Sequence, residues 1–384
     1  MGLRVTIVAH DVDGAGGMER QLRTLIAGLL ERGTSVTVVS RTLGLAAHER
    51  LRWRRVAGPG RPFVLAYPWF ALVASLMLLR SRDGVIHTTG AIVLNRADVC
   101  TVHYLHRGPG GGVNRARRQT PLYRLNASVG KVMCRLLERV VYGSPNRTGK
   151  LVTVSDPLRQ EIVRAFPERI SDVVLIGNGV DINRFRPDPI ARKTIRDELG
   201  LSERDFTALF VGSEWRSKGL DVAIEALGSC AACHLVVVGE GDAREALRHA
   251  ASLGVAERVR LAGETDRPEL YYAAADVFVL PSTYESFSLA AFEAAASGVP
   301  VVATAVGAIP DLVARGGGIL IQPEAAALAS ALERLAGNAL ERSTMGAEGR
   351  RTATELDWVR IVDAYVALYH AVGRSPYPLT ATAS

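Results

Sequence analysis

The sequence predicts an α/β protein made of two doubly wound domains, each built on a parallel sheet. The chain has 384 residues, more than a single hydrophobic core usually holds, so two domains are expected. Short apolar runs rich in Val and Ile alternate with stretches of helical period in both halves. The first run leads through a glycine-rich turn and a helix to a second run, which indicates a βαβ unit with parallel strands.

The first half of the chain supplies the elements of the first domain. They are a strand at 5–9, a glycine-rich turn at 13–17, a helix at 18–32 and strands at 35–40, 84–87, 99–102 and 151–155. Gly33 ends the helix and lets the chain turn into the next strand. Residues 1–183 are therefore assigned to the N-terminal domain.

The second half repeats this organisation. Strands are predicted at 208–211, 235–238, 259–262, 277–280 and 299–303, and helices at 220–227, 243–253, 268–274 and 289–296. The linker is placed at 180–193, where two prolines and alternating charges occur. Residues 184–356 form the second domain, and residues 357–384 hold a last helical period that ends in a frayed tail.

Composition narrows the class of protein. Hydrophobic residues make up 48% of the chain and charged residues 22%, which is typical of a globular protein rather than a disordered one. The formal net charge of +7 allows anionic partners such as phosphates, acidic headgroups or nucleic acid and cannot choose among them. The motifs described below give no reason to expect a nucleic-acid partner, and none is predicted. The N-terminus lacks the pattern of a signal peptide, and four cysteines do not suggest a disulfide framework. We expect a cytoplasmic protein.

One stretch is apolar enough to contact a membrane. Residues 63–79 carry no charge, lie between Arg61 and Arg80, and are interrupted by Pro68. The stretch is shorter than the roughly 20 residues that a membrane span needs. A helix packed on a sheet is the favoured interpretation, and the alternative is an interfacial helix in peripheral contact with the inner face of the membrane.

A cationic group follows the first strand of the second domain. Lys218, one of only four lysines in the chain, comes shortly after a strand and a glycine, in the segment GSEWRSKG. A lysine at this place is suited to neutralise a phosphate, and Arg216 could add a second cation; a solvated helix start is the alternative. Gly239 ends the next strand, which on its own is a weak signal.

Two carboxylates stand in the otherwise apolar segment YESFSLAAFEAAAS. Glu285 is expected in the loop after a strand, and residues 286–289 in the first turn of a helix whose free N–H groups can bind an anion. Glu293 is expected one turn further along. Because carboxylates repel phosphate, they are better suited to accept hydrogen bonds from paired hydroxyl groups of a ribose or a pyranose. These groups together predict a pocket for a nucleoside diphosphate sugar.

The chain resembles the retaining glycosyltransferases of family 4, which have the GT-B fold of two facing Rossmann-like domains with a cleft between them. The resemblance covers nearly the whole chain. It is carried by GGMERQL, NGVDINRF, GSEWRSKG, VVGEGDAREAL, ADVFVLPSTYESFSLAAFEAAASGVPVVAT and VGAIPDLV. The resemblance implies an acceptor-binding N-terminal domain, a second domain that binds the nucleotide sugar, and a terminal helix in DWVRIVDAYVALY that crosses back to the first domain.

The resemblance also implies a role for each matching residue. Glu293 would bind the ribose hydroxyls, Lys218 the diphosphate, and Glu285 the donor sugar. The backbone N–H groups of the residues after Glu285 would face the sugar and the diphosphate; these residues are Ser286, Phe287, Ser288 and Leu289. Gly16 and Gly17 would let the first loop approach the phosphates and the acceptor, and His103 would lie near the sugar at the reaction centre. No metal and no cofactor other than the donor substrate is expected.

Three positions depart from the family pattern. Ser213 stands where the family usually has an arginine, and Arg216 is the candidate to replace that charge. Ser286 and Ser288 stand where glycines are usual, so their side chains would narrow the sugar pocket.

Other signals are interpreted as structural. The DVD segment at 11–13 is favoured as a polar loop over a metal site, because no second set of ligands accompanies it. The CAAC segment at 230–233 is treated as incidental, because a zinc site would need a second pair. His106 lies close to His103 and is the alternative candidate for the reaction centre. The basic glycine-rich loop at 107–118 could cover an acidic acceptor or be a solvated loop.

The predicted function is the transfer of a sugar, with retention of configuration, from a nucleoside diphosphate donor to a hydroxyl of a glycan, lipid-linked or natural-product acceptor. A nucleotide-sugar epimerase of the same fold is an alternative. An NAD-dependent oxidoreductase is a further one, but the first glycine-rich turn lacks the full dinucleotide fingerprint.

Overall fold

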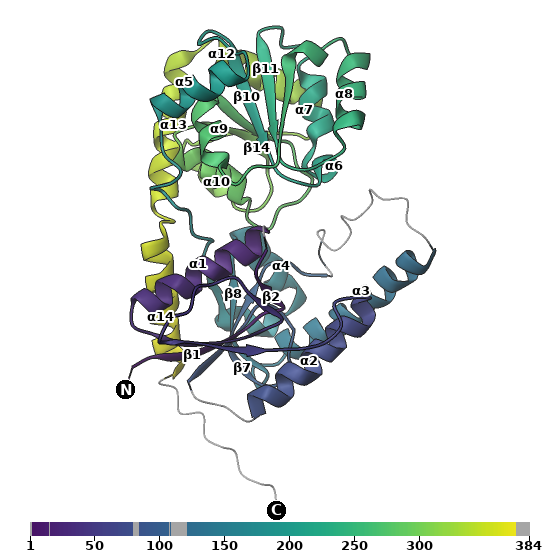
Figure 1. Ribbon diagram of the computed structural model, residues 1–384, viewed down its shortest axis with the longest axis vertical. Helices are drawn as coiled ribbons and strands as arrows, with labels where there is room; N and C mark the ends of the chain where they lie inside the picture. The colour runs from purple at the N-terminus through teal and green to yellow at the C-terminus, as the bar shows by residue number, and fades with distance from the viewer. Residues whose placement is uncertain (1, 15, 80–83, 107, 109–120, 374–384) are drawn as a thin grey trace, which may run out of the picture. The chain divides into compact units, whose positions relative to one another are not determined.

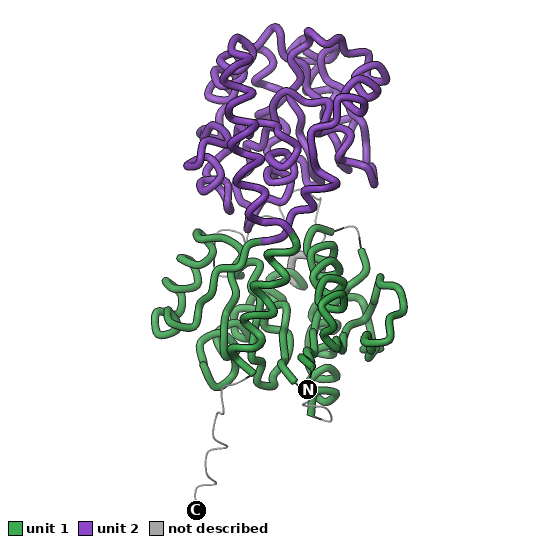
Figure 2. Tube along the Cα trace, turned by 90° about the vertical axis from the view of Figure 1, so that its left-hand side faces the viewer, with its two compact units in different colours: residues 1–177, 358–384 green, residues 178–357 purple. Residues whose placement is uncertain are grey.

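The computed structural model describes residues 2–14, 16–79, 84–106, 108 and 121–373, without the side chains of 121–125. The chain divides into two compact units (Figure 2). Unit 1 comprises residues 1–177 and 358–384, and unit 2 comprises residues 178–357. The first boundary thus lies earlier than the one expected after residue 183. The expected linker also contains the start of the helix α5 (Pro189–Glu198). The carboxylate of Asp188 caps the N-terminus of this helix.

Unit 1 is built on a seven-stranded parallel sheet with helices packed against it (Figure 1). Its strand order is β5-β3-β1-β6-β7-β8-β9, so the order reverses between β1 and β6. The strands are β1 (Arg4–Val8), β3 (Ser35–Ser40), β5 (Leu51–Arg55), β6 (Val85–Thr88), β7 (Ala97–Val102), β8 (Thr148–Thr153) and β9 (Val173–Leu175), with a separate short pair of β2 (Asp11–Val12) and β4 (Thr42–Leu43). The helices are α1 (Gly17–Glu31), α2 (Phe63–Leu79), α3 (Pro121–Tyr142), α4 (Asp156–Ala165), α14 (Trp358–Gly373) and the 3-10 turn η2 (Pro167–Asp172).

Unit 2 has a six-stranded parallel sheet in the order β12-β11-β10-β13-β14-β15. The strands are β10 (Phe206–Val211), β11 (Cys233–Val238), β12 (Val259–Gly263), β13 (Val277–Leu280), β14 (Val301–Thr304) and β15 (Gly318–Ile321). The helices are α5 (Pro189–Glu198), α6 (Trp215–Lys218), α7 (Leu220–Ala226), α8 (Ala243–Ser252), α9 (Pro268–Ala274), α10 (Leu289–Ala296), α11 (Ile309–Ala314), α12 (Ala325–Ala336), α13 (Ala339–Thr354) and the short η3 (Ala256–Arg258). The strand order reverses between β10 and β13, and ligands of open α/β sheets bind at such a point, outside the carboxyl ends of the strands.

The last helix belongs to unit 1, where it packs beside α1 (Figure 1). A buried polar network fixes it to the sheet. His87 on β6 is within hydrogen-bond distance of the Tyr369 hydroxyl (2.7 Å) and of the Thr101 hydroxyl (2.8 Å), and Thr101 also contacts the Tyr365 hydroxyl. Burial lowers the pKa of His87 to about 3, so this imidazole is neutral at pH 7.

One prediction about local structure needs correction, and another is confirmed. Cys230 and Cys233, treated as incidental from the sequence, form a disulfide with a Cα–Cα distance of 5.5 Å. Residues 63–79 form a helix, as favoured, in spite of Pro68. Among the described residues, no helix combines the length and the apolar character needed to cross a bilayer.

Candidate active site

The centre of the candidate site in unit 2 is an ion pair at the point where the strand order reverses. Lys218 ends α6, which follows β10, and Glu285 lies in the loop that follows the neighbouring strand β13. The Lys218 ammonium donates to the Glu285 carboxylate at 2.6 Å, and both side chains are largely shielded from solvent. The structure therefore brings two of the predicted site residues together from segments that are far apart in the chain.

Hydrogen bonds between the two loops hold this pair in place. The backbone N–H and the hydroxyl of Thr283 both donate to the carbonyl oxygen of Ser217, each at 3.2 Å. Ser217 directly precedes Lys218, and Thr283 lies two residues before Glu285. The loop after β13 is thus bonded to α6 beside the ion pair, which limits how far the two charged groups can separate.

Glu293 lies in the interior of unit 2, on the buried side of α10. Its exposed fraction is 6%, and its carboxylate accepts a hydrogen bond from the hydroxyl of Tyr272 at 3.1 Å. Tyr272 is on α9 and is fully buried. Sequence reasoning missed Tyr272, since no local pattern relates it to Glu293. The partner explains how a carboxylate can be placed among the alanines of this helix.

The start of α10 differs from the expectation. The helix begins at Leu289, with Ser288 at the N-cap position, so Ser286 and Phe287 precede the helix instead of forming its first turn. Phe287 is buried and stacks on Phe292, with ring centroids 4.7 Å apart. The first N–H groups of a helix have no partner within it, so this end remains suited to an anion.

Ser288 has an unusual backbone conformation. Its φ of +79° and ψ of +68° lie in the left-handed region, which residues other than glycine rarely adopt. Its side chain is buried, and its hydroxyl oxygen has no hydrogen-bond partner among the residues that the structure describes. The residue thus carries both backbone strain and an unsatisfied polar group, three positions after Glu285.

We expect Ser288→Gly to stabilise unit 2 by about 1 kcal/mol, because glycine relieves the left-handed strain and removes the unsatisfied hydroxyl. Ser286→Gly is the matched control, since Ser286 lies outside the left-handed region and glycine there should stabilise nothing. Urea unfolding followed by fluorescence measures both variants. An equal change in the two variants would contradict the role assigned to the Ser288 backbone.

Several glycines in unit 2 leave space for the candidate site. A Cβ at Gly212 would stand 2.6 Å from Cδ of Lys218, so glycine lets the lysine side chain pass. A Cβ at Gly239 would stand 2.2 Å from the carbonyl oxygen of Gly212, and Gly239 has a φ of +123°. Gly239, predicted to bind the donor, therefore has at least a packing function at the ends of β10 and β11.

The two other residues predicted near Lys218 lie further out. Arg216 is exposed and forms an ion pair with Glu245 on α8. Ser213 is exposed in the loop between β10 and α6. The charge of Arg216 is thus shared with a surface carboxylate, whereas Lys218 is directed at Glu285.

Unit 1 holds the remaining predicted site residues. Gly17 is the first residue of α1 and Gly16 is its N-cap, in the connection after β1 and β2. His103 directly follows β7 and is half-buried. The sheet is parallel, so these residues lie beyond the carboxyl ends of its strands. Burial lowers the pKa of His103 to about 4, so the imidazole is neutral at pH 7.

His106, the alternative to His103, has a different environment. Its Nδ1 lies 2.7 Å from the carboxylate of Glu138, a buried residue on α3 that also accepts from the His106 backbone N–H. Burial alone lowers the pKa of His106, but hydrogen bonds with Cys134 and Glu138 outweigh it and raise the pKa to about 9. His106 is therefore an imidazolium paired with Glu138, whereas His103 is a neutral imidazole.

The metal interpretations have no support among the described residues. Asp11 is bound to Arg41 and to the Thr42 hydroxyl, and Asp13 lies 3.6 Å from Arg23. Within the described part of the chain, no group of three or more His, Cys, Asp or Glu side chains is arranged to hold a metal ion. Apart from Gly108, the basic loop at 107–118 lies outside the described residues.

Two family models match this chain. The model described as Glycosyltransferase Family 4 matches residues 15–184, and the model described as Glycosyl transferases group 1 matches residues 205–338. Together they cover most of unit 1, and in unit 2 they cover the sheet and the segments that hold Lys218, Glu285 and Glu293.

Over the aligned residues, bacterial relatives are about a third identical to this chain. The protein called D-inositol 3-phosphate glycosyltransferase is 32% identical in Geodermatophilus obscurus, where the match covers 71% of this chain and 66% of the relative. The protein of the same name in Thermobifida fusca is 34% identical over 57% of this chain and 54% of the relative. In Thermobispora bispora it is 31% identical over 76% of each chain. The chain thus spans about half to three quarters of the length of these relatives.

Solved structures with low identity share the fold. WaaG, a glycosyltransferase involved in lipopolysaccharide biosynthesis, superposes with a TM-score of 0.78 at 20% identity, covering 97% of this chain and all of WaaG. Anabaena Alr3699/HepE in complex with UDP-glucose gives a TM-score of 0.74 at 19% identity, covering 96% of this chain and all of HepE. The two Rossmann-like parallel sheets, the family models and the relatives agree: the chain belongs to glycosyltransferase family 4 and has the GT-B fold.

Proposed function

We propose that this glycosyltransferase moves a sugar from a nucleoside diphosphate donor to a hydroxyl acceptor, with retention of configuration at the anomeric carbon. The observation that carries the proposal is the Lys218–Glu285 ion pair at the reversal point of the unit 2 sheet, with Glu293 in the adjoining helix. This place combines a cation, a helix N-terminus and two carboxylates, which suits a ligand that contains both phosphates and hydroxyl groups.

Each group on unit 2 has a distinct part in the proposal. Lys218 neutralises the diphosphate, and the N–H groups at the start of α10 donate to its oxygens. Glu285 accepts from a hydroxyl of the transferred sugar, and Glu293 accepts from the ribose hydroxyls while Tyr272 orients its carboxylate. When the donor binds, Lys218 gives up part of its contact with Glu285 and contacts the phosphate instead.

The acceptor is assigned to unit 1. Gly16 and Gly17 have no side chain, so a ligand can come close to the backbone at the start of α1. His103 offers a neutral imidazole that can accept or donate a hydrogen bond in the reaction. In the proposed step, the bond between the anomeric carbon and the diphosphate breaks, and the acceptor oxygen bonds to the same face of the sugar. The acceptor proton passes to the departing phosphate, so neither a protein nucleophile nor a metal is needed. The expected cytoplasmic location is part of this proposal.

Ligand-dependent thermal unfolding tests the donor class. A ligand that binds only the folded state raises its unfolding midpoint, so UDP, GDP, ADP and TDP are compared with NAD. UDP is the first choice, because the HepE structure holds UDP-glucose. We expect one nucleoside diphosphate to raise the midpoint. No shift with any of them would contradict the proposal, and a shift with NAD alone would favour the oxidoreductase.

Glu293→Gln tests the ribose contact. The substitution should weaken binding of the nucleoside diphosphate by about tenfold, the loss of roughly one charge-assisted hydrogen bond. The 2′,3′-dideoxy form of the same nucleotide lacks the hydroxyls, so its weaker binding should not fall further in the variant. Isothermal titration measures all four combinations. Equal losses with the two nucleotides would show that Glu293 does not bind the ribose.

Transfer and its stereochemistry are tested with the donor so identified. D-inositol 3-phosphate is the first acceptor to try, because the bacterial relatives are named for it. NMR of the product should show the same anomeric configuration as the donor. An inverted product would refute retention without affecting the assignment of the donor site.

A further inference from the structure

Unit 1 exposes large apolar side chains along two neighbouring helices. On α2 five exposed positions follow the spacing i, i+4, i+7, i+11 and i+14, which is one stripe of a helix; they are Leu65, Trp69, Leu72, Leu76 and Leu79. On α3 they are Val129, Val132, Leu136 and Val140. The exposed fraction is 53% for Leu72 and 59% for Leu136. We call these nine residues the α2–α3 apolar face.

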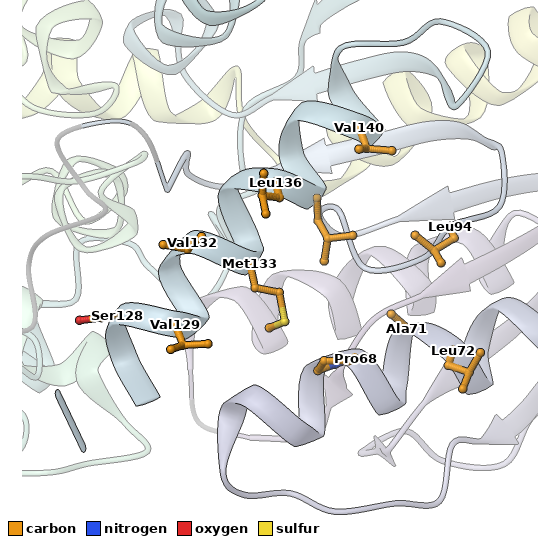
Figure 3. A pocket seen from close by; sticks show the side chains of 11 residues that line it. Pro68, Ala71, Leu72, Leu94, Ser128, Val129, Val132, Met133, Leu136 and Val140 are labelled. Carbon is orange, nitrogen blue, oxygen red and sulfur yellow. The ribbon is translucent and has the colours of Figure 1, made fainter. Parts of the chain in front are cut away.

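A groove runs along this face between the two helices (Figure 3). Its volume is about 640 Å³, and its walls are apolar. Pro68, Ala71 and Leu72 line it from α2, and Val132, Met133 and Leu136 line it from α3. Other residues of the same helices fill the core below, including Phe70, Ala74 and Leu78, so the outer residues are not needed to close that core.

Basic residues lie beside the apolar face. Arg139 is exposed on α3 next to Val140, and Arg61 is exposed just before α2, one turn ahead of Leu65. The Arg147 guanidinium donates to the carbonyl oxygen of Leu94, a residue at the edge of the groove. Within the described stretches 61–79 and 126–147, the one acidic residue is Glu138, which is buried and bound to His106.

The dimensions of α2 distinguish a helix that lies on a membrane from one that crosses it. Its 17 residues measure about 25 Å at 1.5 Å per residue, short of the roughly 30 Å of a hydrocarbon core. Its inner side is already packed in unit 1. Trp69 is half-exposed while its indole N–H donates to the carbonyl oxygen of Ala57, the amphipathic position that tryptophan takes at a membrane interface.

We propose that the α2–α3 apolar face binds the surface of an anionic lipid bilayer. The exposed leucines and valines enter the region of the acyl chains, one chain fits the groove, and the basic residues around it contact the phosphate groups. A second copy of the chain is a poorer occupant. A two-fold interface places the same patch on both sides, so the basic rims would face each other without carboxylates to pair with.

Vesicle flotation tests this proposal with the full-length protein and no donor present. Phosphatidylglycerol mixed with phosphatidylcholine is the anionic membrane, and phosphatidylcholine alone is the neutral one. Wild-type protein should float with the anionic vesicles, bind the neutral ones much more weakly, and be released by added salt. The same bound fraction with both vesicles, or none with either, would overturn the proposal.

Two double variants separate the apolar and the charged contributions. Leu72→Gln with Leu136→Gln should lower the partition coefficient by about tenfold, and so should Arg61→Gln with Arg139→Gln. The matched controls are Leu247→Gln with Leu340→Gln, and Arg204→Gln with Arg244→Gln, which change exposed residues of unit 2 and should bind like wild type. Thermal midpoints show whether each variant is folded. If the test pairs bind like their controls, the face is not the contact.

Analytical ultracentrifugation without lipid tests whether a second copy of the chain binds this face. A monomer over the concentration range is expected. A dimer that the Leu72→Gln and Leu136→Gln pair dissociates would assign the face to self-association and would refute the bilayer. Because neither measurement uses a donor or an acceptor, their outcome is independent of the proposed sugar transfer.

Discussion

Lys218→Met should reduce sugar transfer by about 10²–10³-fold, the range found when a group that stabilises transition-state charge is removed. The ammonium of Lys218 is held at the reversal point of the unit 2 sheet, 2.6 Å from Glu285. In the proposed reaction, negative charge increases on the departing diphosphate, and a shielded cation there gains interaction as the bond breaks. Methionine keeps most of the side-chain stem beside Gly212 but removes the charge.

Binding measurements identify the part of the ligand that Lys218 contacts. Affinity for the nucleoside diphosphate should fall by about tenfold to a hundredfold, whereas affinity for the nucleoside should stay the same. Lys218→Arg should recover part of the diphosphate affinity, since it restores the charge with a different geometry. Equal losses for the nucleoside and its diphosphate would contradict the phosphate contact.

Lys193→Met is the matched control for this prediction. Lys193 also forms an ion pair, with Asp197 at 2.7 Å, but it lies exposed on α5. If removing any lysine ion pair from unit 2 reduced activity, this variant would lose activity too. We expect it to react like wild type, because exposed ion pairs within a helix contribute little.

The sequence predicted the central strands and their helices well. Strands such as β13 and β14 are fully buried runs of apolar residues, so their composition alone indicates them. The edge strand β5 was missed, because its sequence LRWRR is half-exposed and charged. The helix α3 was also missed, although its apolar residues recur with a helical period that could have indicated it.

Pairings between distant segments could not be predicted from the sequence. Glu285 and Glu293 stand out as carboxylates in an apolar segment, but their partners are a lysine 67 positions away and a tyrosine 21 positions away. The left-handed backbone of Ser288 was not predicted either, because serine is an ordinary residue at a helix start. The glycine that is usual in the family at this position was interpreted only in terms of space for the sugar, although glycine also favours a positive φ.

Arg169→Met should lower the free energy of unfolding of unit 1 by about 3–5 kcal/mol, the cost of breaking a buried charged network from one side. Arg169 is completely buried in η2. Its guanidinium donates to the carbonyl oxygens of Tyr142, Thr148 and Gly149 and to the carboxylate of Asp172. Methionine would leave the carbonyl oxygens of Tyr142 and Thr148 without this donor in the buried part of the network.

Thermal and urea unfolding measure this loss. The expected change corresponds to roughly 6–20 °C in the unfolding midpoint of a unit of this size. Arg159→Met is the matched control. Arg159 is exposed on α4 and pairs with Asp156 at 2.8 Å, so its removal should cost less than about 1 kcal/mol. If the two variants unfolded alike, the buried network would not be what stabilises this part of unit 1.

Arg169→Met and the same change in unit 2 together test whether the two units unfold independently. Arg196 on α5 is a buried arginine of unit 2, and it donates to the carbonyl oxygens of Ala274, Ser202 and Asp205. A nucleoside diphosphate bound to unit 2 should raise only the unfolding transition that Arg196→Met lowers. The transition lowered by Arg169→Met should not respond to the nucleotide. If the nucleotide raised that transition as well, either the ligand would bind both units or the units would unfold together, and the donor site could no longer be assigned to unit 2 by this route.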